Sequence, residues 1–238
     1  MRSLKTLVVF AMAIVGTFGM VGVVAGQALE DVSAPSPPGV PPDFNVPMWD
    51  GPDAVLFDNG PLVTHPGGGA GGADASAVQT ALLNSTYGFG HSVSTGYRVA
   101  DDFTVPAGGW LINQITFFAY QTGSTTTSTI NNVNLRIWNG PPNAGGSVIW
   151  GDTTTNVLAT TQWSTIYRVL DTDLLNSQRP IMADTVTVGT VLPPGTYWLD
   201  WQTGGTLTSG PWAPPVTILD RRASRAPTLC STRLPGLL

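Results

Sequence analysis

Residues 97–120 read YRVADDFTVPAGGWLINQITFFAY, and this stretch decides the fold class. Its first part places Val99 and Phe103 on one parity, as in a β-strand with one buried face. In the PAGG sequence at 106–109, the proline fixes φ and the two glycines leave it unrestricted, which predicts a tight reversal of the chain. Residues 110–120 then carry apolar side chains on both parities. Such a strand is typically central and covered on both faces, or presents aromatic groups to a ligand.

Another strand is predicted at residues 131–138, where the side chains alternate strictly. Val133, Leu135 and Ile137 share one parity, and polar or aromatic side chains occupy the other. This period of two is typical of a strand with one buried face. A further strand is predicted at 196–201, directly after a Pro-Pro-Gly turn.

Short segments of this kind, separated by turns rich in Gly and Pro, recur throughout residues 54–218. Their spacing predicts a single all-β domain, built as an antiparallel β-sandwich or jelly-roll-like fold. Residues 75–83 are the exception, because their Ala and Leu content predicts a short helix.

The N-terminus has the pattern of a secretory signal peptide over residues 1–26. Arg2 and Lys5 precede an apolar run at 7–24, and small residues follow at 24–28. The run is about 18 residues long, which reaches the lower limit for crossing a bilayer, so retention as a membrane anchor is the alternative. In either case we expect export to a secreted or cell-surface location.

The composition limits the classes of partner. Charged residues make up 11% of the chain, the formal net charge is -5, and Lys5 is the only lysine. Such a chain lacks the positive charge needed to bind a phosphate backbone, so nucleic-acid binding is excluded. Cys230 is the only cysteine, so no internal disulfide can form.

Two flanking segments differ from the β domain. Residues 27–53 are Pro-rich and lack periodicity, which predicts a disordered spacer. Residues 219–238 are rich in arginine and show no strand alternation. We hypothesise that this tail results from a shifted reading frame, and a disordered basic tail is the alternative.

Four phrases occur together in the chain: LFDNGPLVTHPGGGAGGADAS at 56–76, YRVADDFTVPAGGW at 97–110, TFFAYQTGSTTTSTINNVNLRIWNGPPNAGG at 116–146 and LPPGTYWLDWQTGGT at 192–206. As a set they resemble a group of exported bacterial proteins described as hypothetical, for which a β-sandwich is predicted. The resemblance covers about residues 56–218. It implies the fold and export, and it implies no catalytic residues.

Motifs for catalysis are weak. Ser92 lies in GHSVS at 90–94, which approaches the G-x-S-x-G nucleophile elbow, but the last position is Ser and strand follows instead of helix. A glycosidase needs two carboxylates across a cleft. Glu30, the only glutamate, lies in the spacer, so two aspartates would have to serve. A non-catalytic protein is therefore expected, with an Asp-based hydrolase as the lesser alternative.

Metal ligands are also scarce, since the chain has two histidines and one cysteine and zinc usually needs three or four such ligands. Calcium accepts carboxylates, and Asp171 with Asp173 is the best candidate pair. Their loop lacks the EF-hand pattern. No cofactor is expected, and calcium is the alternative.

The eight tryptophans are more informative. Trp138 lies on the polar parity of its strand, and Trp198 shares a parity with Asp200 and Gln202. Aromatic rings beside hydrogen-bonding groups on a sheet surface suit stacking against a sugar ring. We predict that these four residues bind carbohydrate or another cell-envelope component. A structural or adhesive surface protein without a small-ligand site is the alternative, and membrane contact is expected only if the signal segment is retained.

Overall fold

A computed structural model of the 238-residue chain describes residues 12–17, for which only the backbone is considered, and residues 54–217. The predicted spacer at 27–53 and the tail at 219–238 lie outside the described residues. So does most of the predicted signal segment. No helix in the described part of the chain is long and apolar enough to cross a membrane.

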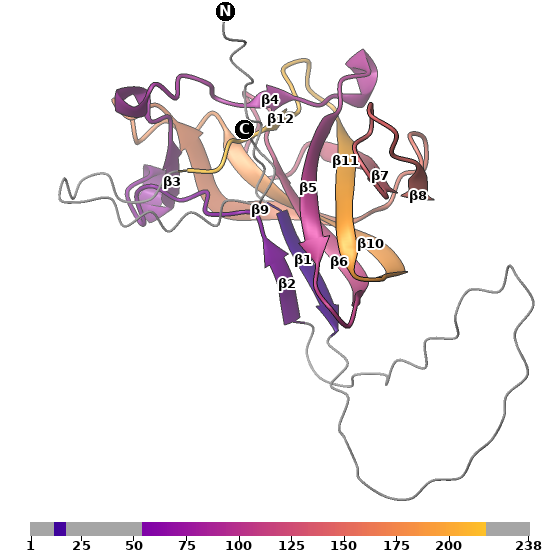
Figure 1. The fold of residues 1–238 in the computed structure, drawn as a ribbon. Helices are drawn as coiled ribbons and strands as arrows, with labels where there is room; N and C mark the ends of the chain where they lie inside the picture. Colours follow the sequence, from indigo (N-terminus) through magenta and orange to yellow (C-terminus); the bar gives the residue numbers. More distant parts are fainter. Residues whose placement is uncertain (1–11, 18–53, 218–238) are drawn as a thin grey trace, which may run out of the picture.

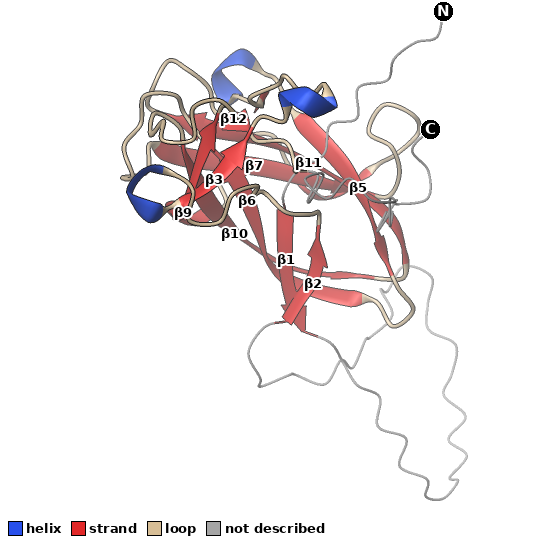
Figure 2. Ribbon diagram, turned by 90° about the vertical axis from the view of Figure 1, so that its left-hand side faces the viewer, coloured by secondary structure: helices blue, strands red, loops and turns tan. Residues whose placement is uncertain are grey.

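The described residues form an all-β structure, as predicted from the sequence, and they also contain three short 3-10 helices (Figures 1 and 2). In chain order the strands are β1 (Met12–Thr17), β2 (Ala54–Asp58), β3 (Asp74–Ala77), β4 (Phe89–Gly90), β5 (Val99–Val105), β6 (Trp110–Ala119), β7 (Ile130–Trp138), β8 (Val148–Gly151), β9 (Leu158–Val169), β10 (Pro180–Leu192), β11 (Gly195–Gly205) and β12 (Trp212–Ala213). The 3-10 helices are η1 (Ala70–Gly72), η2 (Thr80–Leu82) and η3 (Val93–Thr95).

The strands form two main sheets and one small one. The larger sheet has the order β2-β1-β6-β10-β9-β3, the second has the order β5-β11-β7-β8, and β12 pairs with β4. All strand pairs in these sheets are antiparallel except β3 with β9, which are parallel. The antiparallel pairing predicted from the sequence therefore does not extend to β3. A parallel pair needs a long connection, and the chain between β3 and β9 supplies it.

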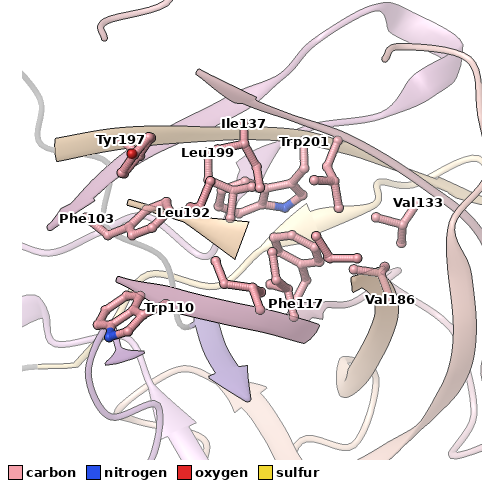
Figure 3. Close-up of a cluster of buried hydrophobic side chains, with 14 of the residues drawn as sticks. Phe103, Trp110, Phe117, Val133, Ile137, Val186, Leu192, Tyr197, Leu199 and Trp201 are labelled. Atoms are coloured by element: carbon pink, nitrogen blue, oxygen red, sulfur yellow. The ribbon is translucent and has the colours of Figure 1, made fainter. Parts of the chain in front are cut away.

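The main core is formed by side chains from strands of both main sheets (Figure 3). The ring centroid of Phe117 on β6 is 4.7 Å from that of Trp201 on β11. Near the turn at 106–109, Phe103 on β5 stacks on Trp110 of β6 with 6.2 Å between ring centroids. Burial of such aromatic surface is the dominant stabilising contribution to a fold without disulfides.

The predicted alternation on β7 is confirmed, because Val133, Leu135 and Ile137 are all buried in this core. On β6, apolar side chains occur on both parities because of a bulge in the strand, and not because both faces are covered. Asn113 is an extra residue relative to β1, since Gly16 pairs with Ile112 and Val15 with Gln114. A bulge of this kind reverses the side-chain parity. Trp110 and Ile112 therefore face the core before the bulge, and Ile115 and Phe117 face it afterwards.

The helix predicted at 75–83 is wrong. Its first part is β3, and its later part is the short helix η2. Arg168 on β9 explains the difference, because its buried guanidinium donates to the carbonyl oxygens of Ser76 and Ala77 at 3.2 and 3.1 Å. Tertiary hydrogen bonds to these carbonyls compete with the intrahelical bonds that a helix would need.

Candidate functional site

The pairing of β11 with β7 brings the four predicted binding residues onto one surface. Trp198 pairs with Trp138, and Gln202 pairs with Asn134. Asp200 lies between them and shares their side of the strand, since side chains alternate. The neighbouring Leu199 points into the core. We call the side of the four-stranded sheet that faces away from this core the outer face.

Asp200 is the centre of the hydrogen bonds on the outer face. Its carboxylate accepts from Arg98 Nε at 2.6 Å, from Arg136 Nε at 3.1 Å and from Trp138 Nε1 at 2.7 Å. The terminal nitrogens of both arginines also form ion pairs with it. The side chain of Asp200 is only 4% exposed. Arg98, Arg136, Trp138 and Asp200 are named here the Asp200 cluster.

Arg98 connects the Asp200 cluster to the amides beside it. Its Nη1 donates to Asn134 Oδ1 and to Gln202 Oε1, both at 2.7 Å. Gln202 Nε2 in turn donates to the carbonyl oxygen of Tyr97 at 3.0 Å. Burial lowers the pKa of the Arg98 guanidinium, and the Asp200 carboxylate opposes this shift. The structure therefore places Asp200 and Gln202 beneath Arg98, where they orient it.

Trp138 is held in a fixed position at the surface of the outer face. Its N–H is donated to Asp200, and the guanidinium carbon of Arg136 lies 4.7 Å from its ring centroid. Trp198 is its direct cross-strand neighbour, and both indoles are half-buried. Trp150, Trp163 and Trp212 are half-buried as well, so exposure alone does not distinguish the predicted pair.

The charge of the Asp200 cluster differs from that of the chain. It combines two guanidinium groups with one carboxylate, whereas the whole chain is acidic. Arg136 keeps 24% of its side chain exposed. The outer face therefore offers a fixed aromatic surface with an arginine at its edge, and Asp102 on β5, the cross-strand partner of Trp198, lies on the same face. Such a surface can stack against the apolar face of a sugar and donate hydrogen bonds to its oxygens.

Sequence reasoning missed Arg98 and Arg136. A signal was present for Arg136, because it lies on the same parity as Trp138 in a strand whose other parity is wholly apolar. No comparable signal existed for Arg98. It precedes β5 and reaches Asp200 across 102 residues of chain.

The elbow-like sequence around Ser92 does not assemble a nucleophile with its base. Ser92 Oγ lies 2.8 Å from Ser94 Oγ and caps the start of η3. His91 is fully buried, with its ring at 75° to that of Trp201, and burial lowers its pKa to about 4. A hydroxyl committed to a cap, next to a histidine whose ring packs inward, has the geometry of a structural turn.

The two aspartates predicted as calcium ligands make separate contacts. Asp171 accepts from the backbone nitrogen of Thr80 at 3.1 Å and from the Thr80 hydroxyl. Asp173 accepts from Asn176 Nδ2 at 3.2 Å in its own turn. Nowhere in residues 54–217 do three His, Cys, Asp or Glu side chains gather as a metal site would require.

Two other carboxyl groups lie on the inner side of the sheets, Asp184 buried and Asp101 half-buried. Asp184 on β10 accepts from Thr161 Oγ1 at 2.5 Å, and its second oxygen has no hydrogen-bond partner. Burial raises its pKa to about 7. Asp101 on β5 accepts from Asn59 Nδ2 at 2.8 Å, and burial raises its pKa to about 6. Both groups bind a proton more tightly in the folded protein than in the unfolded chain.

Comparison of the chain with models of known protein families, with curated proteins and with solved structures finds no match.

Proposed function

We propose that this chain is an exported binding module that recognises carbohydrate through the outer face, with Trp138 as the stacking surface. The observation that carries the proposal is the fixed position of the Trp138 ring, held by Asp200 through its N–H and flanked by Arg136. A ring that is already ordered loses little conformational entropy when a ligand stacks on it. Trp198, paired directly with Trp138, extends the aromatic surface.

The roles of the predicted residues differ within this proposal. Trp138 and Trp198 contact the sugar, and Arg136 donates hydrogen bonds to its hydroxyl or carboxylate oxygens. Asp200 and Gln202 act indirectly, because their contacts orient Arg98, Arg136 and the indole. No bond is made or broken in this function, and no cofactor takes part.

The finer fold and the location belong to the same proposal. The packing of Phe117 against Trp201 between the two sheets supports a β-sandwich, with jelly-roll-like connections between the sheets. The apolar run at 7–24 supports export through a signal peptide. The resemblance to exported bacterial proteins over about residues 56–218 supports both, and with them a location outside the cell or at its surface.

A glycan array tests the proposal. The full chain should bind a defined set of glycans, and Trp138→Ala should weaken that binding at least tenfold, which is about 1.4 kcal/mol. Trp163→Ala is the matched control, because Trp163 is also half-buried and donates its N–H, to the carbonyl oxygen of Ile166. Equal losses in the two variants, or no glycan binding by the native chain, would refute the proposal.

A second function, as a self-associating structural or adhesive surface protein, has support at strand β8. This strand lies at the edge of the four-stranded sheet, and Val148 and Ile149 on it are 41% and 45% exposed. An apolar edge strand is a template for pairing with another chain. Sedimentation should then show that the chain self-associates and that Ile149→Lys abolishes this association. Leu175→Lys, at an exposed loop position, is the control and should leave the association unchanged.

A further inference from the structure

Strand β1 occupies an internal position in the larger sheet. It is antiparallel to β6 on one side, from Met12 opposite Phe117 to Thr17 opposite Leu111. It is antiparallel to β2 on its other side. β2 has no other strand neighbour in its sheet. Figure 1 shows β1 and β2 side by side next to β6. β1 therefore fills a strand-wide slot between β2 and β6.

The six residues of β1 lie within the apolar run of the predicted signal peptide. Cleavage after this run would remove β1 and leave the facing backbone groups of β2 and β6 without their ladder partner. Unpaired backbone groups at a sheet edge favour pairing with another strand. The β6 residues opposite β1 include Ile115 and Phe117, whose side chains are buried in the main core.

The far wall of the slot is attached to the protein by contacts that do not involve β1. Phe57 on β2 packs against Phe103 on β5, with 6.2 Å between ring centroids. Just after β2, Asn59 Nδ2 donates to Asp101 at 2.8 Å, and Thr217 donates its N–H to the carbonyl oxygen of Pro61 at 2.8 Å. We therefore expect these contacts to hold β2 beside the core when β1 is absent.

We propose that the slot between β2 and β6 is a strand-acceptor site, and that its ligand is the apolar segment of residues 12–17 of this same chain. The segment fills the site as part of the intact chain and binds it again as a separate peptide after cleavage. Main-chain hydrogen bonds to both walls supply the affinity, as in other complexes formed by strand addition. The apolar N-terminal run then has a second role, because it completes the sheet as well as directing export.

The test starts from the full chain, folded without export, with a site-specific protease sequence inserted within residues 27–53. Cutting the folded protein separates β1 from β2 without changing any residue of either strand. We expect the N-terminal fragment to co-elute with the domain on size exclusion at micromolar concentration. A labelled peptide of residues 10–19, FAMAIVGTFG, should exchange into the cut protein. Release of the fragment on cutting would overturn the proposal.

A proline variant distinguishes strand pairing from unspecific apolar adhesion. Ile14→Pro removes a backbone N–H and fixes φ within the strand, so the cut fragment should dissociate at least tenfold more readily. The matched control is Val40→Pro, which adds a proline to the Pro-rich spacer and should leave retention unchanged. Equal retention of the Ile14→Pro fragment would also overturn the proposal, because the ladder would then not be the source of binding.

Discussion

Replacing the carboxylate of Asp200 by an amide removes the only anion of the Asp200 cluster at almost constant volume. In Asp200→Asn the guanidinium groups of Arg98 and Arg136 lose their ion-pair partner. The indole N–H of Trp138 keeps only a neutral acceptor. The two cations then face each other across one strand, half removed from water. We therefore expect a marked loss of stability, accompanied by movement of Trp138.

The magnitude follows from the burial of the three side chains. Removing one partner of a buried ion pair costs about 3–5 kcal/mol, because the remaining charge stays desolvated. Asp200 is 4% exposed, whereas Arg98 and Arg136 are 16% and 24% exposed. Water can therefore relieve part of the penalty, which places the expected loss at the lower end of that range, about 3 kcal/mol.

Urea unfolding at pH 7 measures this loss. Asp152→Asn is the matched control, because Asp152 accepts several hydrogen bonds from Thr154 and Thr155 in its own turn but is exposed. Its replacement should change the free energy of unfolding far less. A double-mutant cycle of Asp200→Asn with Arg98→Met should give a coupling of about 1 kcal/mol or more. A loss below about 1 kcal/mol for Asp200→Asn would refute the reasoning that this cluster is a desolvated charge centre.

Three further predictions concern the core and the metal question. The pKa of Asp184 is about 7 in the folded protein, which is above its value in the unfolded chain. The free energy of unfolding should therefore fall as the pH rises from about 4 to about 7. Asp184→Asn should remove a slope of up to about 1.4 kcal/mol per pH unit from unfolding free energies, and an unchanged slope would contradict this. Arg168→Met leaves four carbonyl oxygens, two of them buried, without their donor and should cost at least about 3 kcal/mol in urea unfolding; a neutral effect would contradict it. EDTA should leave the melting temperature unchanged, and an effect that Asp171→Asn and Asp173→Asn abolish would establish calcium instead.

The parts of the fold that followed from the sequence are the strands whose alternation is uninterrupted. On β7 the parity of Val133, Leu135 and Ile137 correctly separates the core from the outer face. The same is true of Leu199 and Trp201 on β11. A period of two is a direct consequence of strand geometry, so it remains legible without knowledge of the partner strands.

The parts that did not follow depend on residues distant in the sequence. The bulge at Asn113 reverses parity within β6, and only the neighbouring strand reveals it. Arg168 holds the backbone after Ala75 in a strand although alanine favours helix. Asp184 lies on the buried parity of β10, between Met182 and Val186. The sequence did contain a signal for this buried titratable group, because Asp184 shares its parity with apolar residues.

For the candidate site, sequence parity placed Trp138, Trp198, Asp200 and Gln202 on one side of their strands. It could not show that Asp200 and Gln202 lie beneath an arginine. That arrangement depends on Arg98, which approaches from the segment before β5. The chemistry of a sheet surface is decided by what covers it, and covering residues come from other parts of the chain.

The most direct test of carbohydrate binding at the outer face is the response of individual indole N–H resonances to a glycan selected on the array. In a two-dimensional nitrogen–proton spectrum, the Trp138 and Trp198 signals should shift in proportion to saturation. The signals of the buried Trp110 and Trp201 should stay in place. Shifts at Trp138 and Trp198 with the binding midpoint of the array glycan are the predicted result. Binding that leaves the Trp138 signal unmoved would contradict the proposed function.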